Sequence, residues 1–108
     1  MSKKMWVVRA TAKKLKHDKY IEDLHDRLKP NYDVITTNIP LYSKKKRKIA
    51  EIDVLAERED TCDAFEVKCS YRPVKAKKQL RKIRKLVPKV KRTYFFCGES
   101  GAIEIIKN

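Results

Sequence analysis

Hydrophobic residues recur at helical spacing in two segments of the chain. The first, residues 13–29, ends at Pro30, and residues 5–12 before it (MWVVRATA) fit either a short strand or an earlier start of the same helix. Its apolar stripe consists of Ile21, Leu24 and Leu28. The second segment, residues 73–87, lies between two prolines, and its stripe consists of Ala76, Leu80, Ile83 and Val87. We therefore expect two amphipathic helices.

Five other segments are rich in β-branched, aromatic or apolar residues and are expected to be strands. They are residues 32–42, 48–57, 62–70, 92–97 and 102–106. Pro40, near the end of the first strand, favours an edge position or a bend, and the polar residues 58–61 (REDT) join the second to the third. The order of a helix, three strands, a helix and two strands predicts an α/β (α+β) fold, with a central mixed sheet flanked by helices in a single domain over residues 1–108.

The chain is strongly basic, and its charge is unevenly distributed. Its 28 Lys and Arg against 14 Asp and Glu give a formal net charge of +14. No acidic residue occurs in residues 34–50 or 69–98, so these segments repel themselves unless an external polyanion relieves the repulsion. Nucleic acid is the commonest such partner. A lysine-rich surface of the thermophilic type and a targeting tract at residues 44–48 (KKKRK) are the alternatives.

The sequence predicts neither membrane insertion nor export. No stretch approaches the roughly 20 apolar residues of a membrane span, and the first ten residues contain too short an apolar run for a secretory signal. We therefore expect an intracellular, cytoplasmic protein without a membrane partner.

Cysteine and histidine spacings do not predict a metal site of their own. Cys62, Cys69 and Cys97 lie in strand-like apolar runs without the paired spacings of zinc sites, so reduced core residues are expected. His17 and His25 have no further ligand pattern around them, which favours a solvated helix surface.

The two sequences EID (residues 51–53) and FEVK (residues 65–68) lie on the second and third expected strands, with eleven residues between them. If Glu59 and Asp60 are the centre of the turn, an antiparallel pairing sets Asp53 opposite Glu66. The same register sets Glu51 opposite Lys68. Strand alternation then gathers these four ionisable side chains on one face and leaves Ile52, Val54, Phe65 and Val67 on the other.

Two facing carboxylates repel each other unless a cation lies between them. Mg²⁺, with Mn²⁺ as a substitute, takes one or two protein carboxylates and completes its shell with waters and substrate phosphate oxygens. Asp53 and Glu66 meet that minimum, and Lys68 would neutralise charge developing on a scissile phosphate. The same residues also fit the exposed face of an ordinary hairpin, with Glu51 and Lys68 as an ion pair. Expected helices on both sheet faces, and an acidic spot in a basic chain, favour the metal site.

The EID and FEVK sequences, on the second and third strands of this element order, resemble the core of the PD-(D/E)xK nuclease superfamily, which has a restriction-endonuclease-like fold. In length and layout the chain is most similar to archaeal Holliday junction resolvases and small bacterial proteins with a similar EID and EVK pair. The likeness covers residues 20–97. It implies that Asp53 and Glu66 are metal ligands, that the backbone carbonyl of Val67 is a third ligand, and that Lys68 is catalytic.

The chain also departs from this superfamily. Members often carry another acid on the first helix, for which Glu22 is the nearest candidate and Asp18 or Asp23 are substitutes. Ile52 stands before Asp53 in place of the proline in the superfamily's name. Gln79 falls where several branches carry a glutamine near the site, although it also fits the border of an ordinary helix. Without a helix acid at the site, we expect neither a second metal nor full activity.

These observations predict a Mg²⁺-dependent endonuclease that hydrolyses the phosphodiester bonds of DNA in preference to RNA. The resemblance implies structure-selective cutting of branched DNA, such as Holliday junctions, by a homodimer. The residues expected to contact backbone phosphates are Lys44, Lys45, Lys46, Arg47, Lys48, Arg72, Lys75, Lys78, Arg81, Lys82 and Lys85. The alternatives are a non-catalytic nucleic-acid-binding module of the same fold and a basic adaptor for an acidic protein.

Overall fold

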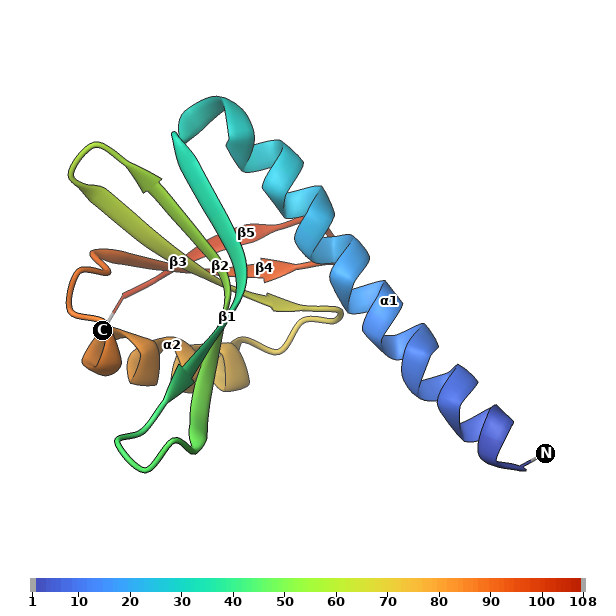
Figure 1. The fold of residues 1–108 in the computed structure, drawn as a ribbon. Coiled ribbons are helices and arrows are strands. Elements are labelled where there is room, and N and C mark those ends of the chain that lie inside the picture. The colour runs from blue at the N-terminus through green and yellow to red at the C-terminus, as the bar shows by residue number, and fades with distance from the viewer. Residues whose placement is uncertain (1, 108) are drawn as a thin grey trace.

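A computed structural model describes the backbone of residues 2–107 and the side chains of residues 15–107. Its elements in chain order are α1 (Ser2–Leu28), a short 3-10 helix (Lys29–Asn31), β1 (Val34–Tyr42), β2 (Lys48–Arg58), β3 (Thr61–Lys68), α2 (Pro73–Leu86), β4 (Arg92–Cys97) and β5 (Ile103–Ile106) (Figure 1). The predicted order of elements is confirmed. Residues 5–12 belong to α1, so the earlier helix start is the correct alternative. No helix in the described part of the chain is long and apolar enough to cross a membrane.

The strands form one mixed sheet in the order β1-β2-β3-β4-β5. β3 and β4 are parallel, and every other neighbouring pair is antiparallel. α2 provides the crossover that a parallel pair requires. β1 is an edge strand, as Pro40 predicts, because a proline has no amide hydrogen to donate to a second neighbour. The molecule is therefore an α+β protein with a five-stranded mixed sheet and two helices.

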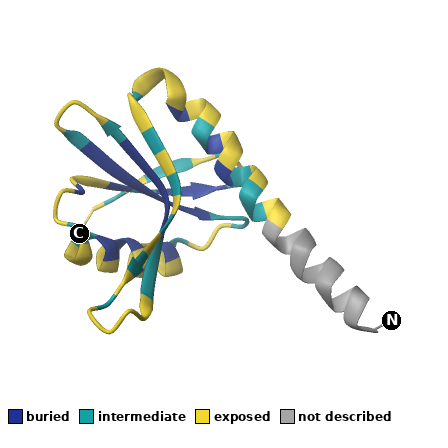
Figure 2. Cartoon of the chain, in the orientation of Figure 1, coloured by how far each residue is buried: buried dark blue, intermediate teal, exposed yellow. Residues whose placement is uncertain are grey.

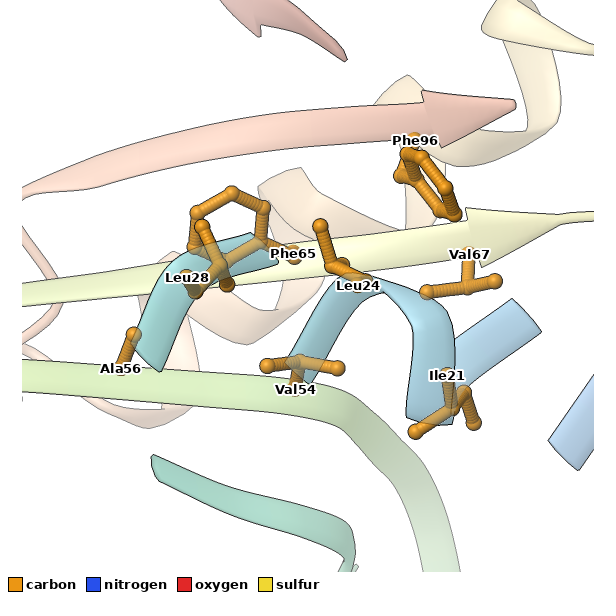
Figure 3. Close-up of a cluster of buried hydrophobic side chains, with 8 residues drawn as sticks. All are labelled: Ile21, Leu24, Leu28, Val54, Ala56, Phe65, Val67 and Phe96. Atoms are coloured by element: carbon orange, nitrogen blue, oxygen red, sulfur yellow. The ribbon is translucent and has the colours of Figure 1, made fainter. Parts of the chain in front are cut away.

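Each helix packs on its own face of the sheet. The core under α1 consists of Ile21, Leu24, Leu28, Val54, Ala56, Phe65, Val67 and Phe96 (Figure 3). The core under α2 includes Leu80 and Ile83 and, from the intervening strand positions, Leu55, Cys62 and Ala64. Because successive strand residues point to opposite faces, the two clusters lie on opposite sides of the sheet. The predicted apolar stripes of both helices and their coverage of both faces are confirmed.

The cysteine prediction is correct for two of the three residues. Cys62 and Cys97 are buried, and all three cysteines are free. Cys69 lies one residue beyond the end of β3 and is only half-buried. The strand ends at Lys68 because the chain must turn there toward α2, so Cys69 does not belong to the core.

β1 and β2 bend together at mid-length (Figure 1). At the bend Asn38 has a φ of 54°, a left-handed conformation that asparagine tolerates better than most residues. The register places it opposite Asp53 but skips this pair, and a register shift follows between Leu41 and Tyr42. Ile52 consequently packs in the α2 cluster whereas Val54 packs in the α1 cluster. The expectation that Ile52 and Val54 share one face is therefore wrong, because it assumed a straight strand.

The β2–β3 hairpin has the predicted register. Arg58 pairs with Thr61, so Glu59 and Asp60 form the turn, and Glu59 adopts a φ of 50°. The ladder runs from this turn to the pair Val54–Phe65 and stops there. β3 continues beside β4 as far as Lys68. β2 and β3 thus separate at the position where Asp53 would have faced Glu66.

Gly98 lets α1 approach the turn between β4 and β5. A Cβ atom at this position would lie 2.3 Å from the ring of Tyr20, which is closer than any real contact. The amide of Gly98 also donates a hydrogen bond of 2.8 Å to the carbonyl of Lys68, at the end of β3. The contact therefore holds α1, β3 and the β4–β5 turn together at one end of the sheet.

We expect Gly98→Ala to lower the free energy of unfolding by about 1–3 kcal/mol, because either Tyr20 or the turn has to move. Urea denaturation monitored by circular dichroism would measure the change. Gly101→Ala is the matched control for the space, because the nearest atom to its added Cβ is 3.7 Å away on the Arg27 side chain. Its cost would come from its φ of 76° alone. The Tyr20→Ala, Gly98→Ala double variant should show coupling, and additive effects would contradict the contact.

Candidate functional site

Asp53 lies where β2 leaves β3, and its carboxylate fills the gap. The residue is 5% exposed, and its Oδ2 accepts a hydrogen bond of 2.9 Å from the backbone amide of Val67. That amide lies beyond the last β2–β3 pair, so it would otherwise lack a partner on this side of β3. The bend and the carboxylate therefore support each other, and the side chain is held in place by backbone.

Glu66 is a buried carboxylate with one unsatisfied oxygen. The residue is 3% exposed, and its Oε2 lies 3.3 Å from Nζ of Lys68. Its Oε1 is the one buried side-chain nitrogen or oxygen atom in the described residues that has no hydrogen-bond partner. Burial, followed by the negative charge of Asp53, raises the pKa of Glu66 to about 8, and the Lys68 ammonium opposes this shift. Asp53 and Glu66 therefore act on each other across the gap, as the predicted register requires.

Asp63 shows how this protein satisfies a buried acid that has a structural role. Its carboxylate accepts hydrogen bonds from the Tyr32 hydroxyl at 2.5 Å and from Nε and Nη2 of Arg92 at 3.1 and 3.0 Å. The side chain is fully buried, yet both oxygens have partners. Glu66, three residues away on the same strand, has a single cationic neighbour. The unsatisfied oxygen is thus a particular property of the Asp53–Glu66 site.

His17 belongs to this site, and the sequence prediction of a solvated surface residue is wrong. Its Nε2 donates a hydrogen bond of 3.0 Å to the carbonyl of Val67 and lies 3.7 Å from Oδ2 of Asp53. The nearby Asp53 carboxylate, followed by the hydrogen bond to the Val67 carbonyl, raises the pKa of His17 above its usual value, and burial opposes this shift. One sequence signal was available: His17 stands four residues before Ile21, so it continues the buried stripe of α1 toward the sheet.

The acids expected on the first helix lie elsewhere. Asp18 and Glu22 line a groove of about 380 Å³ together with Thr37 and Asn38 of β1, and Glu22 is exposed. Asp23 is exposed as well. No hydrogen bond or ion pair joins any of these three acids to Asp53 or Glu66 among the side chains that the structure describes. The α1 contribution to the site is an imidazole.

The predicted patch of four ionisable residues is divided in two. Oε1 of Glu51 is 2.8 Å from Nζ of Lys48, while Lys68 pairs with Glu66. Glu51 therefore does not lie opposite Lys68 as expected, and the alternative of an ion pair between them is wrong too, because the β2–β3 ladder ends before it reaches Glu51. Gln79 is exposed and shares a cavity of about 170 Å³ with Glu51, Lys82 and residues 49–50. The structure places Gln79 beside Glu51, where α2 meets β2.

The basic residues of the two acid-free segments are exposed, except Arg84, which is half-buried. Residues 44–48 form the tip and first strand position of the β1–β2 hairpin, and Lys48 alone among them pairs with an acid in the described structure. Arg72, Lys75, Lys78, Arg81, Lys82 and Lys85 are exposed at the start and along the outer side of α2 (Figure 2). The cavity that Lys82 shares with residues 49–51 joins the hairpin to α2. We call the exposed basic residues of these two segments, on the β1–β2 hairpin and on α2, the basic face.

The site offers a metal ion only a few protein ligands. Within the described residues, no group of three or more His, Cys, Asp and Glu side chains is arranged to hold an ion. Two carboxylates and the adjacent Val67 carbonyl are oxygen donors of the kind that Mg²⁺ prefers. The arrangement therefore fits an ion that keeps waters or substrate oxygens in its shell, and it does not fit a closed structural site.

A scan of the chain against protein-family models gives no match, and a search among curated proteins gives none either.

The raised pKa of Glu66 predicts an unusual pH dependence of stability. The folded state keeps the Glu66 proton up to about pH 8, whereas an ordinary glutamate loses it near 4.5. The folded state therefore binds more protons in this range, and the free energy of unfolding falls as pH rises, by up to about 1.4 kcal/mol per pH unit. We expect Glu66→Gln to remove this component in urea titrations with a chelator.

Glu51→Gln is the matched control, because Glu51 is a less buried carboxylate paired with Lys48. It should keep the wild-type slope between pH 5 and 8. Parallel pH profiles for wild type and Glu66→Gln would contradict the buried, protonated state of Glu66.

Proposed function

We propose that the protein is a Mg²⁺-dependent endonuclease of the PD-(D/E)xK type, with a restriction-endonuclease-like core, which hydrolyses phosphodiester bonds of DNA. The observation that carries the proposal is the pair of buried carboxylates at the separation of β2 and β3, with Lys68 beside them and Oε1 of Glu66 unsatisfied. A structural ion pair would have satisfied that atom, as Asp63 and Arg92 do. When Glu66 is ionised, a cation would supply the missing partner.

Asp53, Glu66 and the Val67 carbonyl would hold the ion. Mg²⁺ bound there supplies Lewis acidity toward a phosphate oxygen and lowers the pKa of water in its shell. Glu66 has to be ionised to act as a ligand, so ion binding and loss of its proton are coupled. Its pKa of about 8 places this exchange near neutral pH, where affinity for the ion should rise with pH.

Lys68 would neutralise negative charge on the phosphate that is cleaved. Its Nζ is 3.3 Å from Glu66 and its side chain is 23% exposed, so the ammonium stands between the buried acids and solvent. A substrate phosphate that approaches the carboxylates from solvent therefore meets Lys68. The ammonium also offsets the repulsion between that phosphate and the two acids.

His17 would take the position that the resemblance gives to an acid on the first helix. It contacts both Asp53 and the Val67 carbonyl, which are two of the three proposed ligand groups. It would hold these groups in place when no ion is bound. A histidine in place of an acid lowers the negative charge of the site, which favours one ion over two.

The basic face would bind backbone phosphates without reading the base sequence. Lysine and arginine contacts to phosphates provide affinity and register, but no base recognition. The resemblance favours branched DNA as the substrate and a homodimer as the assembly, because the similar resolvases act on DNA junctions. DNA is proposed in preference to RNA on the same ground.

Cleavage of labelled DNA in Mg²⁺ tests the assignment. We expect Asp53→Asn to lower the cleavage rate by about 10²-fold or more, because it removes ligand charge, and Lys68→Met to lower it by about 10²- to 10³-fold. Single-turnover assays on duplex, branched and single-stranded substrates would measure these rates, with binding measured separately.

Glu51→Gln is the control again, because it removes an acid two residues from Asp53 on the same strand that lies outside the proposed ligand set. It should cleave within a few-fold of wild type. Equal rates for wild type, Asp53→Asn and Lys68→Met would rule out the proposed site, even if some cleavage were seen.

A non-catalytic nucleic-acid-binding module is the second candidate function. It is favoured by the small number of side-chain ligands, because no third acid or imidazole in the described residues is arranged to bind an ion together with the two carboxylates. This candidate predicts steeply salt-dependent binding and no metal-dependent product. Asp53→Asn would then leave DNA affinity unchanged or increase it, because a negative charge is removed from the surroundings of the basic face.

A further inference from the structure

Tyr71 presents a fixed aromatic ring to solvent just beyond the candidate site. The residue is 60% exposed. Its hydroxyl donates a hydrogen bond of 3.2 Å to Oε1 of Glu104, and its ring lies 5.6 Å from that of Phe95 at an interplanar angle of 53°. Phe95 is fully buried, so it anchors the tyrosine from below. The ring is therefore held at two points while most of its surface remains free.

The exposed ring forms one wall of a shallow cavity of about 310 Å³, lined by Tyr71, Arg72, Pro73, Val74 and Lys75. This volume is at the lower limit of ligand pockets, which start at about 300 Å³. The apolar part consists of Tyr71, Pro73 and Val74, and Val74 is 71% exposed. Arg72 and Lys75 flank it, and neither forms an ion pair in the described part of the structure. A ligand with a flat apolar ring joined to anionic groups would fit this combination of an apolar wall and two flanking cations.

The cavity lies close to the candidate site. Tyr71 follows Lys68 by three residues, so their Cα atoms are at most about 11 Å apart. The connecting segment is held by hydrogen bonds from the amides of Gly98 and Glu99 to the carbonyls of Lys68 and Cys69, at 2.8 and 2.9 Å. A strand of DNA rises about 3.4 Å per nucleotide, so a base at Tyr71 would lie within about three nucleotides of a phosphate at Lys68.

We infer that Tyr71 is a stacking platform for an unpaired nucleobase next to the phosphate that is cleaved, with Arg72 and Lys75 on the flanking phosphates. In a duplex both faces of each base are covered by neighbouring bases, so only an unpaired or displaced base can reach the tyrosine. The platform makes the protein selective for junctions, gaps and single strands. The inference rests on the proposed nuclease function, and it assigns structure selectivity to one side chain.

The test compares two DNA duplexes that differ by one unpaired base, which is 2-aminopurine so that stacking is seen as a loss of fluorescence. All measurements use the Asp53→Asn chain, so that the DNA is not cut. Loss of the ring in Tyr71→Leu should weaken binding to the unpaired-base duplex by about 5- to 150-fold and abolish the quenching, while binding to the paired duplex stays the same. Leucine still covers Phe95, and Tyr71→Trp should retain both signals.

Tyr42→Leu is the matched control, because Tyr42 is also 60% exposed but lies at the end of β1. It should leave the ratio of the two affinities unchanged. The inference is overturned if Tyr71→Leu keeps the fluorescence quenching, or if it weakens binding to both duplexes by the same factor. It is also overturned if Tyr71→Leu changes the oligomeric state measured by sedimentation but leaves the ratio of the two DNA affinities unchanged. The patch would then be an interface between two copies of the chain.

The failure of this inference can be separated from the failure of the proposed function. Asp53-dependent cutting of a fully paired duplex does not involve an unpaired base. If that cutting is observed and the Tyr71 effects are absent, the platform alone is wrong. If the Tyr71 effects are observed without any Asp53-dependent cutting, the platform stands as part of a binding module and the nuclease proposal is wrong.

Discussion

The hydrogen bond from the Val67 amide to the Asp53 carboxylate closes the gap that opens where β2 leaves β3. Without it, the separated strands would bury a backbone amide with no partner, at a cost of about 1–3 kcal/mol. The bend at Asn38 moves β2 away from β3, and Asp53 replaces the missing strand. Every other feature of the candidate site follows from this separation. It leaves room beside Glu66, exposes the Val67 carbonyl to His17, and releases Lys68 from cross-strand pairing with Glu51.

The site buries an acid in surroundings that destabilise the folded state. Glu66 is buried beside a second carboxylate with one oxygen unsatisfied, whereas the neighbouring Asp63 has donors on both oxygens. A chain selected for stability alone would provide Glu66 with a second donor or replace it with an apolar residue. Local destabilisation of this kind is typical of functional sites, where a ligand provides the missing interaction. The position of the unsatisfied atom, next to Asp53 and Lys68, is the observation on which the proposed phosphodiester chemistry rests.

Local signals in the sequence were sufficient for most of the fold and for the register that relates Asp53 to Glu66. The stripes at Ile21, Leu24 and Leu28 and at Ala76, Leu80 and Ile83 report helix faces directly, and a two-residue turn fixes pairing over a whole hairpin. Pro40 suggested a bend in the first strand as an alternative to an edge position. Its place at Asn38 and its effect on the second strand left no periodic signal, so the face of Ile52 and the residue opposite Glu51 were predicted wrongly. His17 was missed because the strand that it meets is 50 residues away in the chain.

The central claim is that Asp53 and Glu66 share one divalent cation at the separation of β2 and β3. Anomalous diffraction from a crystal soaked in Mn²⁺ tests it most directly, because manganese scatters anomalously far more strongly than carbon, nitrogen, oxygen or magnesium. The account predicts an anomalous peak in contact with both carboxylates, lost in a Glu66→Gln crystal of the same form. A fully occupied Mn²⁺ site elsewhere, with no peak between these two acids, would contradict it.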